Sequence, residues 1–248
     1  MLEIKDLKVY IQAFQGKPWN EECDSAYNGF KQLGFQVELF TTTEQLKNME
    51  RSDLVVGGML IMEHVLNDAE IKLEPVDYPE EIFKYCGRKI WVTSICKLRN
   101  YPLPLFIKPV KEKKAKGIII NNWEDLKEFD HLNSNELVYC SEVVNFISEW
   151  RCFVRYRKLL GVQNYFGDSE KKPDLSIVSA AIADYDSMPN SCALDFGVTS
   201  DGRTLLIEVN DGFAIGSYNL PDEKYAMFLM TRWAQIMNIE DVLANTAK

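Results

Sequence analysis

Histidine is scarce in this sequence, and cysteine never occurs as a closely spaced pair. The two histidines, His64 and His131, lie far apart in the chain. The sequence therefore offers few side chains for a zinc site or for a histidine-based catalytic triad. The six cysteines are scattered and form no Cys-x-x-Cys motif. We therefore expect reduced, mostly buried thiols rather than a disulfide framework.

The sequence also lacks an excess of positive charge and a long apolar run. Lys and Arg total 28 against 37 Asp and Glu, a formal net charge of −9, which disfavours general binding to nucleic-acid phosphates. No uncharged apolar run approaches the roughly 18 residues of a membrane span, and charged residues interrupt the N-terminal segment. We expect a cytoplasmic protein without nucleic-acid or membrane partners. The oligomeric state is not predicted.

The first third of the 248 residues alternates between strand and helix patterns. These patterns are a strand at 8–14, a helix at 20–33, a strand at 35–40, a helix at 43–49 and a buried strand at 53–58. Such alternation predicts a small parallel α/β domain, residues 1–87.

The remainder of the chain has an antiparallel, α+β pattern. The predicted elements are strands at 105–109, 118–120, 137–140 and 149–157, a helix near 123–129 and a helix at 222–237 with one apolar stripe. We expect a second domain at 88–248, with a small lid subdomain at about 104–141 and a central and C-terminal part at 142–248. The predicted fold class is thus α/β followed by α+β.

The most informative stretch, 193–210, has two alternating runs around Asp201-Gly202, a pair that favours a two-residue type I′ turn. With that turn Asp195 lies directly opposite Glu208, and Asn210 follows on the same face. Two facing carboxylates repel one another, so the arrangement requires a cation or a raised pKa. Oxygen ligands of these three types suit Mg²⁺. The alternative is a solvent-facing hairpin, or a bulge that breaks the register.

A lysine projects from another predicted strand. Lys108 follows Leu-Phe-Ile and precedes a proline, which keeps the backbone extended, so its ammonium can act as a fixed charge on phosphate oxygens. A strand-end surface lysine is the alternative. The lysines between 111 and 116 fit either a solvated turn or a phosphate-covering lid.

Two arginines and a carboxylate share a third strand. Period two places Glu149, Arg151 and Arg155 on one face. Arginines in this setting suit bidentate binding of a phosphate or a carboxylate. An internal salt-bridge ladder is the alternative.

Together these residues resemble the ATP-grasp superfamily. The order is the same: the strand lysine Lys108, the adenine-hinge residues 141–143, a Glu-x-Arg strand, and an Asp strand followed by Glu-Val-Asn210. The resemblance covers about residues 88–248. The α/β unit that precedes them occupies the position along the chain at which the family has its preATP-grasp domain. The arginine strand is similar to the ATP-grasp branch named for two arginines and a lysine, found in bacteria and phages.

The resemblance implies an ATP-dependent carboxylate-amine ligase that uses ATP and Mg²⁺. It assigns three groups of residues, namely Lys108 for the ATP phosphates; Ser141, Glu142, Val143 and Glu149 for adenine and ribose; and Asp195, Glu208 and Asn210 for Mg²⁺. A small-molecule or peptide carboxylate would attack the γ-phosphate, and an amine would capture the acyl-phosphate. No protein nucleophile is required, so catalysis rests on positioning and charge.

One departure from the family concerns an arginine that many members carry two residues before the metal-binding aspartate. Ala193 stands there in this chain. Arg151 or Arg155 would supply the catalytic charge from the neighbouring strand. An ATP-grasp phosphotransferase and a catalytically weak ATP-binding regulatory module are the alternative functions, and the acid and amine substrates are not predicted.

Overall fold

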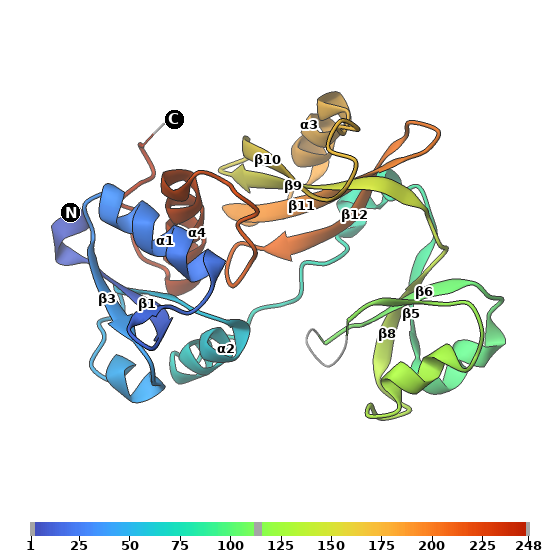
Figure 1. The fold of residues 1–248 in the computed structure, drawn as a ribbon, viewed down its shortest axis with the longest axis horizontal. Helices are drawn as coiled ribbons and strands as arrows, with labels where there is room; N and C mark the ends of the chain where they lie inside the picture. Colours follow the sequence, from blue (N-terminus) through green and yellow to red (C-terminus); the bar gives the residue numbers. More distant parts are fainter. Residues whose placement is uncertain (1–2, 112–115, 247–248) are drawn as a thin grey trace.

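The computed structural model describes residues 3–111 and 116–246, and their strands form three sheets (Figure 1). The N-terminal sheet contains β1 (Lys8–Phe14), β2 (Lys17–Pro18), β3 (Gln36–Phe40) and β4 (Leu54–Val56). β1 pairs in parallel with β3 and β4, whereas β2 adds an antiparallel edge. The parallel α/β unit predicted for the first third of the chain is therefore present.

Helices α1 (Glu21–Gln32) and α2 (Met59–Asp68) accompany this sheet. α1 begins where the Asn20 side chain accepts a hydrogen bond from the Cys23 amide at 2.9 Å, an N-cap that satisfies a free amide of the first turn. It ends before Gly34, whose φ of +87° favours glycine. The helix expected at 43–49 is only a short 3-10 helix, Thr43–Leu46, and α2 is a helix that the sequence pattern does not indicate.

The central sheet is antiparallel and has the order β10-β9-β11-β12. Its strands are β9 (Phe146–Arg155), β10 (Lys158–Gly167), β11 (Ser191–Thr199) and β12 (Thr204–Asp211). β9 ends before the predicted limit of 157, because Tyr156 and Arg157 have left-handed φ angles of +47° and +60° and turn the chain into β10. α3 (Leu175–Asp184) covers one face, where Val178 packs in the same cluster as Leu194.

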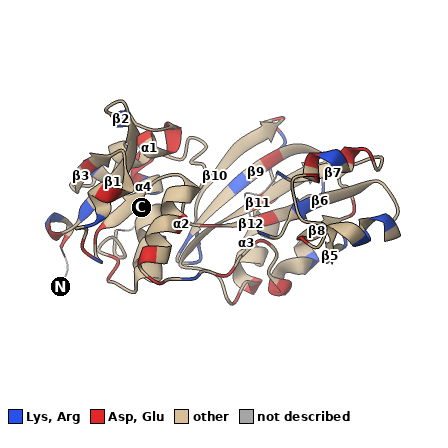
Figure 2. Cartoon of the chain, turned by 90° about the horizontal axis from the view of Figure 1, so that it is seen from below, with Lys and Arg blue, Asp and Glu red and all other residues tan. Residues whose placement is uncertain are grey.

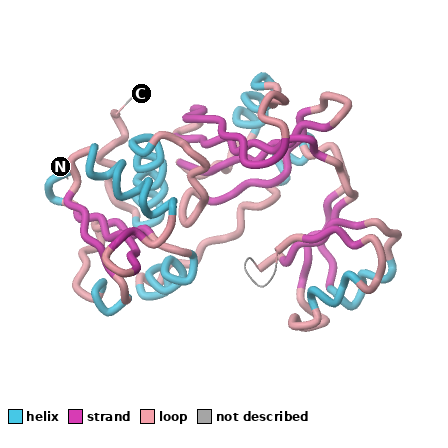
Figure 3. Tube along the Cα trace, in the orientation of Figure 1, coloured by secondary structure: helices cyan, strands magenta, loops and turns pink. Residues whose placement is uncertain are grey.

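Helix α4 (Asp222–Met237) has the predicted bounds and lies between the central sheet and α1 (Figures 1 and 3). Its Phe228 makes an edge-to-face contact with Phe153 of β9, with ring centroids 5.2 Å apart. A Cβ atom at Gly29 of α1 would lie 2.0 Å from the Asp222 carbonyl oxygen, so the close helix contact requires glycine. One hydrophobic core therefore extends across the predicted domain boundary.

The small sheet stands apart from the N-terminal unit (Figure 1) and is antiparallel, with the order β5-β8-β6-β7. Its strands are β5 (Ile90–Ser94), β6 (Leu105–Pro109), β7 (Ile118–Ile120) and β8 (Leu137–Ser141). β5 precedes the expected start of the small subdomain at about 104, so this unit begins earlier in the chain. The helix expected at 123–129 is a 3-10 helix, Asp125–Phe129, and further 3-10 helices are Ile4–Asp6, Glu80–Tyr85 and Ile95–Asn100.

An extended linker, residues 70–79, runs from α2 to the 3-10 helix Glu80–Tyr85, after which β5 enters the small sheet (Figure 1). Five of the six cysteines are buried and Cys96 is exposed, which agrees with the expectation of mostly buried free thiols. Within residues 3–111 and 116–246, no helix is both long and apolar enough to cross a membrane.

Candidate functional site

The β11–β12 hairpin pairs Asp195 with Glu208, as predicted. The predicted two-residue turn is wrong, however. The Thr199 amide donates to the Arg203 carbonyl at 3.0 Å and Gly202 has a φ of +84°, so the loop comprises residues 200–202 with a left-handed glycine at its end.

A bulge in β12 restores the predicted pairing. Phe196 lies opposite Leu206, although its neighbour Asp195 lies opposite Glu208, so Ile207 is the extra residue. The longer loop shifts the register by one residue and the bulge shifts it back. The carboxylates consequently face one another because these two departures cancel.

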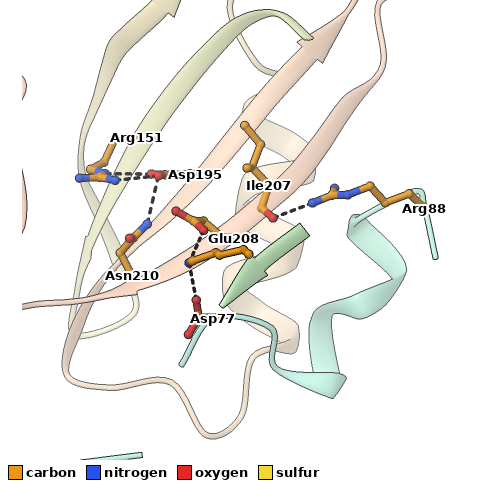
Figure 4. Close-up of polar contacts among 8 residues, drawn as sticks. Asp77, Arg88, Arg151, Asp195, Ile207, Glu208 and Asn210 are labelled. Carbon is orange, nitrogen blue, oxygen red and sulfur yellow. Dashed lines mark hydrogen bonds and ion pairs between the residues drawn. The ribbon is translucent and has the colours of Figure 1, made fainter. Parts of the chain in front are cut away.

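Arg151 of β9 neutralises Asp195. Its Nε and Nη2 donate to the two carboxylate oxygens at 2.9 and 2.7 Å, and the Asn210 amide donates to Oδ2 at 3.0 Å (Figure 4). Burial raises the pKa of Asp195, and the facing guanidinium opposes that shift. The arginine cannot deprotonate, and a neutral partner would leave its charge buried alone, so the two groups form an ion pair.

Lys108 of β6 forms ion pairs with both Glu208 and Asp77. Its ammonium lies 2.8 Å from Glu208 Oε2 and 2.5 Å from Asp77 Oδ1 (Figure 4). Burial lowers the pKa of Lys108, but the charges of Glu208 and Asp77 outweigh this effect and raise it above its ordinary value. The small sheet and the central hairpin therefore meet at this lysine. Asp77 comes from the linker and is a site residue that the sequence analysis missed.

Two tyrosines, also missed, cover Arg151. Tyr165 and Tyr218 stack with centroids 5.1 Å apart and an interplanar angle of 22°, and the guanidinium lies 4.7 Å from the Tyr218 ring. Tyr165 also interacts with Glu149, whose pKa is raised by burial. Glu149 and Arg151 of β9, which carries both acidic and basic residues (Figure 2), are thus joined through one aromatic pair.

Two adjoining cavities extend from these residues towards the N-terminal unit. The first, of about 290 Å³, is lined by Lys108, Arg151, Asn210 and the loop 214–216. The second, of about 260 Å³, shares that loop and reaches Trp19 at the start of α1. Open space therefore lies directly beside the charged side chains Lys108 and Arg151.

The family model that matches residues 85–228 describes an ATP-grasp domain, family 2 of the clade named for two arginines and a lysine. The chain belongs to this ATP-grasp family. The matched segment contains Lys108, Arg151 and the Asp195–Asn210 hairpin, whereas Asp77 precedes it.

Three solved structures share the fold. The D-alanine–D-alanine ligase from Bacillus anthracis complexed with ATP has 13% sequence identity and a TM-score of 0.58, covering 94% of this chain and 98% of that one. D-cycloserine synthetase DcsG has 12% identity and a TM-score of 0.58, covering 92% and 99%. A RimK domain ATP-grasp protein from Sphaerobacter thermophilus has 13% identity and a TM-score of 0.50, covering 90% and 99%. The comparison with curated proteins found no match.

The ATP-grasp hairpin offers a donor set that suits Mg²⁺. Asp195, Glu208 and Asn210 provide two carboxylates and one amide, and Mg²⁺ commonly completes such a shell with water and phosphate oxygens. The Asn210 nitrogen donates to Asp195, which leaves the amide oxygen as the candidate ligand. In the described part of the chain, no group of three or more His, Cys, Asp or Glu side chains is placed to hold a metal ion. Water and phosphate oxygens would therefore have to complete the shell.

The predicted adenine-hinge residues lie where β8 leaves the small sheet. The Ser141 hydroxyl donates to the Glu142 carbonyl at 3.0 Å, and the Glu142 carboxylate accepts from the Lys89 amide at 3.0 Å. Glu142 and Val143 line a cavity of about 950 Å³ together with Arg88. Arg88 was missed by the sequence analysis; its guanidinium donates to the Ile207 carbonyl at 2.8 Å and so supports the bulged strand (Figure 4).

The structure does not bring Arg155 to this ATP-grasp site, which corrects its assignment as a candidate catalytic residue. Its Nε donates to the Thr231 hydroxyl at 2.7 Å and its Nη2 to the Leu243 carbonyl at 2.5 Å. Arg155 shares a strand face with Arg151, but four residues along a strand amount to about 13 Å. Of the lysine-rich segment, Lys113 and Lys114 lie outside the described residues.

Proposed function

We propose that this protein is an ATP-dependent carboxylate-amine ligase. The ion pair between Lys108 and Glu208, 2.8 Å long, is the observation that carries the proposal. It brings a strand lysine of the small sheet onto the carboxylate hairpin of the central sheet. A triphosphate bound there would meet a cation from one side and candidate metal ligands from the other.

Each group in the site has a proposed role. Lys108 binds the phosphates, Ser141, Glu142 and Val143 line the adenine site, and Glu149 holds the ribose. Asp195, Glu208 and Asn210 would hold Mg²⁺, which neutralises phosphate charge when bound. The solved structures named above support ATP as the nucleotide, since one of them is a ligase in complex with ATP.

The proposed reaction has two steps. An oxygen of the substrate carboxylate attacks the γ-phosphorus, and the bond from that phosphorus to the β-phosphate oxygen breaks to release ADP. An amine then attacks the carbonyl carbon of the acyl-phosphate, phosphate leaves, and the amine loses a proton. Arg151 is the guanidinium that contacts the hairpin carboxylate, and it can stabilise the negative charge that develops on oxygen.

The cavities support small reactants. Because the two adjoining spaces of about 290 and 260 Å³ share residues 214–216, an acid and an amine can lie side by side between the central sheet and α1. We propose small-molecule or peptide substrates of these two classes.

Calorimetric titration with a non-hydrolysable ATP analogue, with and without Mg²⁺, tests the nucleotide site. We expect Mg²⁺-dependent binding that Glu208→Gln weakens and that Glu170→Gln, at an exposed loop position, leaves unchanged. Absence of binding under every condition would contradict the proposal. With acid and amine pairs, amine-dependent release of phosphate identifies the ligase, whereas phosphorylation of the acid alone identifies a phosphotransferase.

A further inference from the structure

Asp77 lies in the linker that runs from α2 of the N-terminal unit to the 3-10 helix Glu80–Tyr85. The residue is only 1% exposed, and its backbone carbonyl accepts a hydrogen bond from the Val209 amide at 2.9 Å. This backbone bond attaches the linker to β12 directly beside Glu208. The position of Asp77 is therefore fixed by the central sheet and does not depend on the ion pair with Lys108.

Among the described residues, the Asp77 carboxylate has one hydrogen-bond partner, Lys108. Oδ1 lies 2.5 Å from the ammonium, whereas Oδ2 is buried without a hydrogen bond. A buried carboxylate oxygen left without a donor costs stability. The neighbouring Tyr78 makes an edge contact with Tyr139, 4.8 Å between centroids, and Tyr139 lies opposite Lys108 in the small sheet. The linker therefore contacts the strand pair that carries Lys108 at two successive residues.

The charges in this cluster do not cancel. Lys108 contributes +1 while Asp77 and Glu208 contribute −1 each, so the three groups sum to −1. Arg151 and Asp195 next to them sum to zero. A triphosphate without metal would meet a net negative cluster whose lysine ammonium is already held by two carboxylates.

We propose that Asp77 is a positioning residue that restrains Lys108 in the nucleotide-free protein and thereby makes nucleotide binding depend on a divalent cation. The inference rests on the proposed function. Asp77 is held by its backbone, so the long lysine side chain is the part that moves. A cation on Glu208 offsets the negative charge and frees one lysine donor for phosphate, whereas Asp77 continues to hold the ammonium in place.

The test compares dissociation constants for a non-hydrolysable ATP analogue in magnesium chloride and in EDTA. In the wild-type protein the constant in EDTA is expected to exceed that in Mg²⁺ by a large ratio. Asp77→Asn removes one negative charge close to the phosphates and should lower this ratio about tenfold or more by improving metal-free binding. Asp68→Asn, an exposed aspartate of α2, controls for net charge and should leave the ratio unchanged.

The outcomes are distinct. If Asp77→Asn weakens binding equally in both conditions, or leaves the ratio as it is, Asp77 is only a structural residue and the inference is overturned. If wild-type protein binds no analogue even with Mg²⁺, the proposed function fails and this inference fails with it. Asp77→Ser removes the unpartnered oxygen together with the charge and gives the same test should the asparagine variant not fold.

Discussion

Arg151 reaches across from β9 to hold Asp195 of β11 with two hydrogen bonds, of 2.9 and 2.7 Å, and the two residues lie directly opposite one another in the sheet. Many ATP-grasp ligases place an arginine two residues before this aspartate, where this chain has Ala193. The neighbouring strand thus delivers a guanidinium to the same hairpin. Tyr165 and Tyr218 contact Arg151 through their rings, which carry no charge. Asp195 is therefore the group that balances the positive charge of Arg151.

Arg151→Lys should therefore impair both stability and catalysis. A lysine keeps the charge but cannot form the bidentate pair. We expect the free energy of unfolding to fall by about 1.5–3 kcal/mol, the usual contribution of charged hydrogen bonds. Turnover should fall by about 10²-fold or more, as for other donors that stabilise a developing oxyanion. Denaturant unfolding and ADP release measure the two effects.

Arg155→Lys is the matched control, because it changes the same residue type on the same strand face. It should lower the unfolding free energy through its lost bonds to Thr231 and Leu243 but leave turnover per folded molecule near wild type. Equal losses of turnover in the two variants would contradict the role given to Arg151.

Lys108→Ala should weaken nucleotide binding by about 1.5–3 kcal/mol, the range for a hydrogen bond to a charged group. The substitution also leaves Asp77 and Glu208 without their shared cation, so repulsion between the carboxylates and the phosphates adds to the loss. Calorimetric titration at saturating Mg²⁺ measures the change. Unchanged affinity would mean that Lys108 serves only to join the small sheet to the hairpin.

The facing pair Asp195 and Glu208 could be predicted because strand alternation determines which residues share a face. The loop length could not, since a left-handed Gly202 suits both two-residue and three-residue turns. The bulge at Ile207 depends on tertiary support, including the Arg88 hydrogen bond to its carbonyl. The correct pairing therefore rests partly on two compensating irregularities that no local pattern reveals.

Three site residues lie outside the strands that the sequence pattern predicts, and sequence reasoning did not find them. Asp77 lies in a linker without periodicity and meets Lys108 across 31 positions of the chain. Tyr165 and Tyr218 come from β10 and from the loop after β12, and only the folded sheet brings their rings together. Arg155 was instead assigned to the site wrongly. Period two predicts the face of the strand on which a residue lies, but not whether the site extends that far along the strand.

Thiol reactivity should distinguish Cys96 from the other five cysteines. Burial raises the pKa of Cys23 to about 11 and that of Cys140 to about 12, so their thiols stay protonated and inaccessible at about pH 8. Cys96 is exposed. We expect a thiol-specific chromogenic disulfide to modify one cysteine rapidly in the native protein and all six after denaturation. Cys96→Ser should abolish the rapid phase; a remaining rapid phase would show that a second thiol is accessible.

Tyr218 is the residue through which the loop after β12 contacts Arg151. It adopts a left-handed φ of +44°, which a non-glycine residue rarely does, and its ring lies 4.7 Å from the guanidinium. Tyr218→Ala removes a cation–π contact of about 0.5–2 kcal/mol. Because Arg151 then loses lateral support, we expect a several-fold fall in kcat with a smaller change in the KM for ATP.

Tyr218→Phe separates the ring from its hydroxyl. It retains the aromatic face over Arg151 and the stack on Tyr165, so it should recover most of the turnover that Tyr218→Ala loses. Steady-state kinetics of both variants, with circular dichroism to confirm folding, provide the comparison. If the phenylalanine variant is as impaired as the alanine variant, the hydroxyl rather than the ring carries the function, and Tyr218 then acts on a bound reactant instead of on Arg151.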